Sequence, residues 1–286
     1  MKKLLASVLL CTLACACLVL PALADFNVSS LVNVVSREDG SGTRGAFIEL
    51  FGVEERGQDG TRTDRTTLEA IIVNKTDVML TSVAGDTYAI GYVSLGSLND
   101  SVRALNIDGV QATTDNVKNG TYPISRPFNI ATKGEASALA QDFIDFILSA
   151  EGQSVVSSGY IPVQDDATPY AGASQSGKLV IAGSSSVTPI MEKLTEAYRV
   201  IHPEVAIEIQ MSDSSAGMTG AIDGTCDIGM ASRDLKDSEL AELNATSIAL
   251  DGIAVIVSQE NPLEGATREQ VRALFTGELT TWSEVQ

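Results

Sequence analysis

The fold is decided by residues 31–51, which read LVNVVSREDGSGTRGAFIELF. The five residues 31–35 are mostly apolar and β-branched, which predicts a short buried strand. The turn over 36–43 is rich in glycine and serine, and the apolar spacing of 46–51 predicts a helix that Thr43 caps. This order of strand, turn and helix start is where open α/β sheets bind their ligands.

Arg37 lies at the end of the predicted strand and supplies a planar set of hydrogen-bond donors. The first N–H groups of the following helix have no partner inside the helix, and the helix dipole adds partial positive charge there. Together these features predict a site for a small tetrahedral anion. The alternative is that Gly40 and Gly42 only form a tight turn while Arg37 pairs with Asp39.

The same arrangement recurs in the second half of the chain. A strand, a Gly/Ser turn and a helix are predicted over 178–198 and again over 205–222, and a further strand ends at Ser232-Arg233. Each turn supplies hydroxyls and backbone N–H donors, although helix capping alone explains any single one of them. Strands that alternate with helices predict an α/β fold with parallel sheets.

The first 24 residues predict a signal peptide. Two lysines precede an apolar run, and the small residues 22–24 supply a cleavage site after Ala24. We therefore expect export to the periplasm or the cell surface. The alternative is a lipid anchor on Cys15 or Cys17.

The exported chain is strongly acidic. The whole sequence has a formal net charge of −18 at pH 7, and loss of the two leader lysines lowers it to −20. This charge repels nucleic acid, so no nucleic-acid partner is expected. An anion site must then be local and rich in hydrogen bonds. A mature length of about 260 residues suits two domains, and we expect a monomer.

Catalytic, metal and cofactor sites are not predicted. His202 is the single histidine, precedes a proline, and is expected at the surface. The chain has neither a Gly-x-Ser-x-Gly elbow nor a Walker loop. After export Cys226 is the only thiol, so no internal disulfide is expected, and metal binding is left to carboxylate-only sites. The sequence therefore indicates a binding protein rather than an enzyme.

Four segments resemble the phosphate-binding protein of the bacterial phosphate ABC transporter. They read REDGSGT (37–43), IAGSSSVTP (181–189), SDSSAG (212–217) and DIGMASRDL (227–235). The Gly91-Tyr92-Val93 strand and the Thr281-Trp282 pair fit as well, so the resemblance covers nearly all of the exported chain. It implies a type II periplasmic-binding-protein-like fold, with two α/β lobes, each a mostly parallel sheet flanked by helices, and phosphate in the cleft between them.

The resemblance also implies which residues contact phosphate. The expected contacts are Arg37, Ser41, Gly42, Thr43, Ser184, Ser185, Ser186, Ser214, Ser215, Ser232 and Arg233. One departure concerns selectivity. The family can place an aspartate, which accepts a proton from phosphate, where Ser232 stands here.

The two blocks of the chain stand in the reverse of the family's order. In the family, the block found here at 178–286 comes first and the block at 26–170 comes second. This resembles a circular permutation in which the linker-like segment 168–177 joins the former ends. A truncated tandem or a mis-assembled gene is the alternative.

The permuted order changes the expected lobe boundaries. With two crossings between lobes, one lobe is continuous over 125–255 and includes the linker. The other is split into 26–124 and 256–286. Within the split lobe, residues 67–72 are predicted to form a short helix.

The expected function is capture of inorganic phosphate outside the cytoplasmic membrane and its delivery to the permease of an ABC transporter. Another oxyanion, such as sulfate or tungstate, is the alternative ligand. From a different class, the chain is a surface or adhesion module that has lost ligand binding. That alternative would place Arg37 and Ser214 on opposite outer faces.

Overall fold

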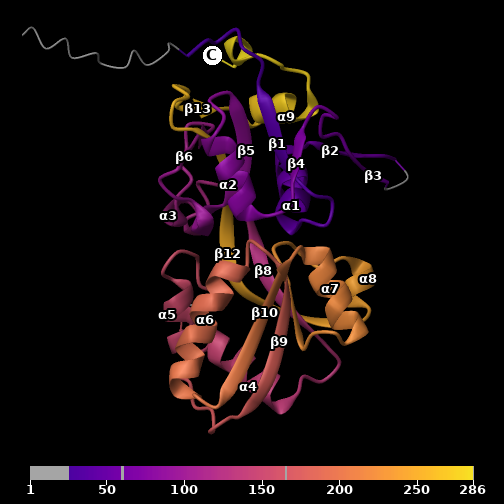
Figure 1. The fold of residues 1–286 in the computed structure, drawn as a ribbon, viewed down its shortest axis with the longest axis vertical. Helices are drawn as coiled ribbons and strands as arrows, with labels where there is room; N and C mark the ends of the chain where they lie inside the picture. Colours follow the sequence, from indigo (N-terminus) through magenta and orange to yellow (C-terminus); the bar gives the residue numbers. More distant parts are fainter. Residues whose placement is uncertain (1–25, 59–60, 165, 286) are drawn as a thin grey trace, which may run out of the picture.

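Two lobes lie end to end, and two long antiparallel strands run between them (Figure 1). These crossing strands are β8 (Ser125–Lys133) and β12 (Leu243–Ser258). Helices cover the sheet of each lobe, and the parallel strand pairs belong to the lobes while the crossing strands pair antiparallel. The predicted two-lobed α/β fold is confirmed.

This computed structural model describes residues 26–58, 61–164 and 166–285. The predicted signal peptide (1–24) lies outside the described residues. Among the helices that are described, none is long and apolar enough to cross a membrane.

Lobe one contains the first strands and helices together with the C-terminal part of the chain (Figure 1). Its central strand β1 pairs in parallel with β5 on one side and β4 on the other. Its elements are β1 (Asn33–Arg37), α1 (Gly42–Phe51), β2 (Glu54–Arg56), β3 (Arg62–Asp64), β4 (Ile71–Val73), α2 (Thr76–Ala84), β5 (Ala89–Ser94), the 3-10 helix η1 (Leu95–Ser97), β6 (Val102–Ala104), β7 (Asn106–Ile107), α3 (Thr114–Lys118), β13 (Gly265–Ala266), α9 (Arg268–Thr276) and the 3-10 helix η2 (Trp282–Glu284).

Lobe two is built on the parallel strands β10, β9 and β11, in that order. A continuous path of hydrogen-bonded strands runs from β10 through β8 and β12 into lobe one. The elements of lobe two are α4 (Ala138–Leu148), α5 (Ala150–Val156), β9 (Gly177–Ser184), α6 (Thr188–Ile201), β10 (Val205–Ser212), α7 (Ser214–Asp223), β11 (Ile228–Ala231) and α8 (Asp237–Leu240).

The buried apolar residues divide in the same way as the strands. The core of lobe one uses residues from 34–124 and 253–285, together with Ile161. Two smaller clusters in lobe two use residues from 128–249. Burial of these side chains stabilises each lobe by about 25 cal/mol for every Å² of apolar surface removed from water.

Helix α1 begins at the predicted turn, but its cap differs from the prediction. Ser41 is the N-cap, and its hydroxyl accepts a hydrogen bond from the backbone N–H of Arg44 at 3.3 Å. The prediction of Thr43 as the cap is therefore wrong. Thr43 lies in the first turn of the helix, and its hydroxyl faces the other lobe, where it contacts Ser186. Gly52 ends the helix in the left-handed conformation, with φ of 72°.

The prediction of a helix over 67–72 is also wrong. The backbone N–H of Ala70 donates to the carbonyl of Thr67 at 3.1 Å, which forms a single turn. Residues 71–73 then form β4, which pairs in parallel with β1. This segment is rich in β-branched residues, which favour a strand when a sheet edge is available.

The segment 168–177 is held against lobe two by an aromatic side chain. Tyr170 Oη donates to Asp142 Oδ2 at 2.5 Å and lies 2.8 Å from His202 Nε2. His202 is only 3% exposed, so the expectation of a surface histidine is wrong. Tyr198 packs beside the imidazole, with ring centroids 4.5 Å apart, which explains its burial.

Candidate functional site

The predicted anion turns meet between the lobes, at the carboxyl ends of strands from both. Arg37 ends β1, Ser184 ends β9, and Ser232 follows β11. Most of the predicted contact residues are buried there. The side chains at most 4% exposed are Arg37, Ser41, Thr43, Ser184, Ser185, Ser186, Ser214 and Ser232.

Hydroxyl groups from the two lobes contact one another directly. Thr43 Oγ1 lies 2.8 Å from Ser186 Oγ and 3.4 Å from Ser232 Oγ. Ser184 Oγ donates to Ser232 Oγ at 3.0 Å, and the backbone N–H of Ser232 donates to Ser214 Oγ at 3.1 Å. We name these side chains and two neighbours the hydroxyl cluster: Thr43, Thr76, Ser184, Ser185, Ser186, Ser214 and Ser232.

Arg37 binds both the hydroxyl cluster and a neighbouring carboxylate. Its Nη2 donates to Ser185 Oγ at 3.1 Å, across the lobe interface. Its Nε and Nη2 also donate to the two carboxylate oxygens of Glu38, each at 2.8 Å. The pairing with Asp39 considered from the sequence is wrong, because the Asp39 side chain is 96% exposed and pairs with Arg44 at 2.8 Å.

Thr76, at the start of α2, belongs to the cluster but was not predicted. Its Oγ1 lies 3.2 Å from Ser185 Oγ and 3.3 Å from Ser186 Oγ, and Arg37 Nη1 donates to it at 3.4 Å. A sequence pattern that could have identified Thr76 was present. Strand β4 followed by the start of α2 is the same arrangement as the other turns, and the wrong helix over 67–72 concealed it.

Arg126 is a second buried cation that the sequence did not reveal. It is 3% exposed, and its Nη1 lies 2.9 Å from Asp251 Oδ2. Burial raises the pKa of Asp251 to about 6, although Arg126 beside it acts in the other direction. The two buried side chains form an ion pair, in which the carboxylate balances the charge of Arg126.

The hydroxyls are arranged as donors. An N–H group can only donate, so a hydroxyl oxygen that accepts from one must direct its own proton elsewhere. Ser185 accepts from Arg37, Thr43 accepts from Arg126 at 3.1 Å, and Ser214 accepts from a backbone N–H. A buried group of directed donors beside a guanidinium suits an oxyanion, whose oxygens are acceptors.

Two glycines allow the lobes to approach this closely. A Cβ added to the buried Gly42 would overlap Ser214 Oγ and lie 2.8 Å from Ser232 Oγ. A Cβ added to Gly40 would overlap the carboxylate of Asp213, and the carbonyl of Gly40 accepts from the Ser215 backbone N–H at 3.2 Å. The glycine-rich turn therefore fits the opposite lobe only without side chains.

Ser215 and Arg233 lie at the edge of the site. Arg233 forms two bonds with the carboxylate of Glu239, at 2.7 and 2.8 Å, and its Nη2 donates to Ser215 Oγ at 3.3 Å. Its Nη1 also donates to the Asp234 carbonyl at 3.0 Å. The guanidinium of Arg233 is thus occupied by partners outside the hydroxyl cluster.

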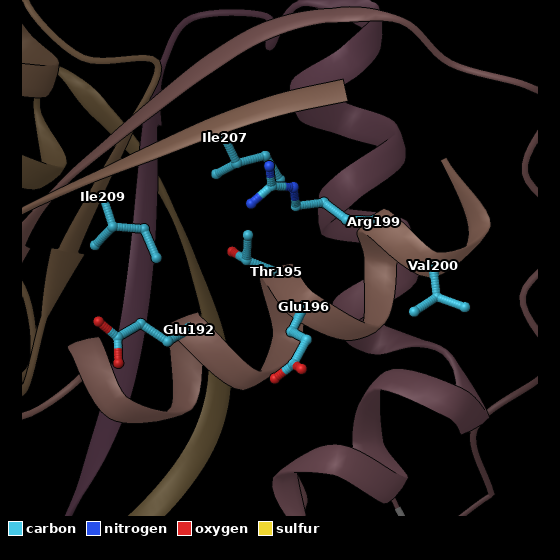
Figure 2. Close-up of a pocket in the computed structure, with 7 residues that line it drawn as sticks. All are labelled: Glu192, Thr195, Glu196, Arg199, Val200, Ile207 and Ile209. Atoms are coloured by element: carbon cyan, nitrogen blue, oxygen red, sulfur yellow. The ribbon is translucent and has the colours of Figure 1, made fainter. Parts of the chain in front are cut away.

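A groove of about 680 Å³ between α6 and β10 lies apart from these residues (Figure 2). Its walls combine apolar side chains with two carboxylates and one guanidinium, so negative charge predominates and an oxyanion is disfavoured. The lining residues are Glu192, Thr195, Glu196, Arg199, Val200, Ile207 and Ile209. Across the described part of the chain, no group of three or more His, Cys, Asp or Glu residues could hold a metal ion.

Comparison with known proteins identifies the family. The model of the PBP superfamily domain matches residues 25–151 and 168–286. The chain belongs to the PBP superfamily. This placement agrees with the two-lobed fold and with a polar site at the lobe interface.

Three relatives of this superfamily member carry names that mention phosphate. "Phosphate-binding protein PstS 2" of Streptococcus agalactiae is 55% identical over 257 residues, which cover 89% of this chain and 87% of the relative. The crystal structure of a phosphate-binding protein of a phosphate ABC transporter from Streptococcus pneumoniae has a TM-score of 0.71 and 46% identity, and covers 90% of this chain and 100% of that one. "Phosphate-binding protein PstS" of Bacillus subtilis is 37% identical over 139 residues, covering 47% of this chain and 42% of the relative.

Replacing Gly42 with alanine should prevent the lobes from meeting as closely as they do here. The new methyl group would overlap Ser214 Oγ, and overpacking of this kind costs about 1–3 kcal/mol. If the closed arrangement is the one that binds ligand, the dissociation constant for the ligand should rise roughly 5- to 150-fold. Titration calorimetry of Gly42→Ala against the unchanged protein measures this.

Gly45→Ala is the matched control, since it lies one turn later on the same helix. Its added Cβ would meet only Arg233 Cδ, at 3.8 Å, which is ordinary contact. Its affinity should equal that of the unchanged protein. Equal affinities for Gly42→Ala and Gly45→Ala would contradict the close approach of the lobes.

The Arg233–Glu239 pair should make stability depend on pH. Burial alone raises the pKa of Glu239, but the hydrogen bonds from Arg233 and from the Lys236 backbone hold it below its usual value of 4.5. The stabilisation is therefore present above pH 4.5 and is lost as the pH falls through the lowered pKa. Glu239→Gln should reduce the free energy of unfolding by about 1–3 kcal/mol at pH 7.

Urea denaturation at a series of pH values measures this difference. The gap between Glu239→Gln and the unchanged protein should close as the solution becomes more acidic than pH 4.5. Glu242→Gln, at an exposed position nearby, should show no gap at any pH. A gap for Glu239→Gln that stays constant down to about pH 3 would contradict the assignment.

Proposed function

We propose that this protein captures inorganic phosphate outside the cytoplasmic membrane and delivers it to the permease of an ABC transporter. The observation that carries the proposal is the buried hydroxyl cluster, in which Ser185, Thr43 and Ser214 each accept from an N–H group and so present their protons as donors. The guanidinium of Arg37 adds charge-assisted hydrogen-bond donors beside these hydroxyls. The streptococcal relatives named as phosphate-binding proteins support the same ligand.

Ligand entry requires the lobes to move apart. In the arrangement described, Thr43 and Ser186 are each 1% exposed, so no anion in solution reaches them directly. Closure of two lobes about a hinge is a common way to enclose a ligand. We propose that β8 and β12 carry this hinge, and that the closed form presents phosphate to the permease.

The protein's own residues bear on the choice between phosphate and sulfate. Phosphate keeps a proton near pH 7, and that proton needs an acceptor in the site, whereas sulfate has none to donate. Ser232 stands where the family can place an aspartate, and a hydroxyl both donates and accepts. We therefore propose phosphate as the ligand with sulfate or tungstate as competitors, rather than a site that rejects them strongly.

The other classes of function find less support. A ligand-free adhesion module would place Arg37 and Ser214 on opposite outer faces, but both are buried parts of one network. A histidine-dependent hydrolase would need His202 near a nucleophilic serine. Its imidazole is instead hydrogen-bonded to Tyr170 and to the backbone N–H of Gln175, both in the segment 168–177. We propose a binding role without catalysis.

Removal of the Arg37 guanidinium should weaken phosphate binding strongly. Truncation of one partner of a buried charged pair costs about 2–5 kcal/mol, or roughly 30- to 5,000-fold in the dissociation constant. Titration calorimetry of Arg37→Ala with phosphate, and with sulfate as competitor, measures this. Arg37→Lys keeps the positive charge but loses the planar, multi-donor geometry of the guanidinium. Its affinity for phosphate should therefore lie between those of Arg37→Ala and the unchanged protein.

The matched control is Arg62→Lys, because Arg62 is exposed and its Nη1 lies 3.6 Å from Glu49 Oε2, away from the hydroxyl cluster. It should bind phosphate with nearly unchanged affinity. Folded, unchanged protein that gives no heat with phosphate would sink the proposed function. Unchanged affinity in Arg37→Ala would remove Arg37 from the site.

We also propose that the chain is a circular permutation of the family's usual order, with lobe boundaries near residues 125 and 256. Three observations support it. The Ser283 N–H bonds to the Val28 carbonyl at 2.7 Å, so the segments around these two residues lie side by side. The Bacillus relative aligns with 47% of this chain, as expected when a collinear alignment stops at a rearrangement. The Streptococcus agalactiae relative aligns over 89%, which counts against a mis-assembled gene.

A chain rebuilt in the other order tests the permutation. Residues 173–285 would come first, followed by a short Gly/Ser linker and then residues 26–172, so that Tyr170 is kept. Because the segments to be joined are adjacent, the rebuilt protein should fold and bind phosphate within about threefold of the unchanged affinity. Circular dichroism and calorimetry measure both properties, and a rebuilt chain that stays unfolded would contradict the permutation.

A further inference from the structure

Arg126 connects both lobes through one planar group. It is the second residue of the crossing strand β8, and its Nε donates to the Ser232 carbonyl of lobe two at 2.8 Å. Its Nη2 donates to Thr43 Oγ1 of lobe one at 3.1 Å. Its Nη1 faces the crossing strand β12, where it donates to the Gly252 carbonyl at 3.3 Å and pairs with Asp251.

The bond to Thr43 determines what the Thr43 hydroxyl can do. A guanidinium has no acceptor, so Thr43 Oγ1 must accept and its own proton must point to another oxygen. In the arrangement described, the hydroxyl oxygens within reach are Ser186 Oγ, 2.8 Å away, and Ser232 Oγ, 3.4 Å away. An oxyanion that enters between these side chains would accept a hydrogen bond from the same hydroxyl. Without Arg126, both lone pairs of Thr43 Oγ1 would be free, and one of them could face the anion in place of the proton.

The bond from Arg126 to the Ser232 carbonyl fixes the turn after β11, which forms the lobe-two side of the site. The Ser232 backbone N–H donates to Ser214 Oγ at 3.1 Å, and its side chain accepts from Ser184. A rigid guanidinium that holds the Ser232 carbonyl therefore fixes the turn on which these two contacts depend. Lysine cannot replace it, because an ammonium on a flexible stem does not reach three separate acceptors in fixed directions.

We propose that Arg126 is a positioning residue for the oxyanion site, which fixes Thr43 as a donor and holds the turns of both lobes in register. This inference rests on the proposed function, since it assigns a role at the same site. The competing explanation is that Arg126 only neutralises Asp251 inside the protein. The two explanations differ in whether the effect of Arg126 passes through Thr43.

A double-mutant cycle on the full chain separates them, with inorganic phosphate as the probe. Arg126→Lys keeps a charge beside Asp251 but loses the bond to Thr43, so the dissociation constant should rise at least about tenfold. In a Thr43→Val background the same change should alter it less than about threefold, because the hydroxyl is already gone. Binding too weak for calorimetry is measured as the rise in Tm with added phosphate.

Arg103→Lys is the matched control. Arg103 also donates to a backbone carbonyl, that of Asn261, but within lobe one only, and its affinity for phosphate should be unchanged. If Arg126→Lys does not fold by circular dichroism, Arg126→Gln combined with Asp251→Asn removes both charges, and the same loss of about tenfold is expected.

The outcomes separate the inference from the proposed function. Phosphate binding by Arg126→Lys within about threefold of the unchanged protein would overturn the inference alone. If Arg126→Lys causes equal losses with and without the Thr43→Val replacement, the inference is overturned as well. Unchanged protein that binds no phosphate, sulfate or tungstate would overturn the proposed function and the inference together.

Discussion

The rest of the structure depends on the requirement that buried hydroxyls be hydrogen-bonded. A buried polar group without a partner costs about 1–3 kcal/mol, and the hydroxyl cluster gathers several such groups in one place. Some of these groups bond within lobe two, but others bond only when both lobes are in contact, as Thr43 and Ser186 do. The closed arrangement is therefore favoured by the same groups that would bind an anion. An oxyanion that accepts from them replaces these bonds rather than leaving any group unpaired.

Local dipoles explain how so acidic a chain can hold an anion. The sequence carries a net charge of −18, yet Arg37 is partly neutralised by Glu38, and Arg126 by Asp251. Little net charge remains inside the site. The attraction must come from short, directed hydrogen bonds, whose reach is far below the roughly 8 Å over which exposed charges are screened in physiological salt. Selection among anions then depends on the positions of donors, and less on the total charge.

The sequence predicted those parts that local patterns determine. Strand, Gly/Ser turn and helix start are short-range signals, so the turns carrying Arg37, Ser184 and Ser214 can be located from the residues alone. Thr76 was missed because 70–73 is a short apolar run, and periodicity over so few residues does not separate a strand from a helix. Arg126 was missed because its role depends on partners far along the chain, such as Thr43, 83 residues before it. Such long-range pairs leave no periodic trace in a single sequence.

The position of Arg126 on a crossing strand links the hinge to the site. A residue within one lobe could hold only that lobe's turn, but β8 pairs with β12 at the junction of the two lobes. A guanidinium anchored there reaches Thr43 on one side and Ser232 on the other. When the lobes separate, at least one of these bonds must break, while the pair with Asp251 lies on the crossing strands and can persist. The proposed hinge and the candidate site therefore share one buried arginine.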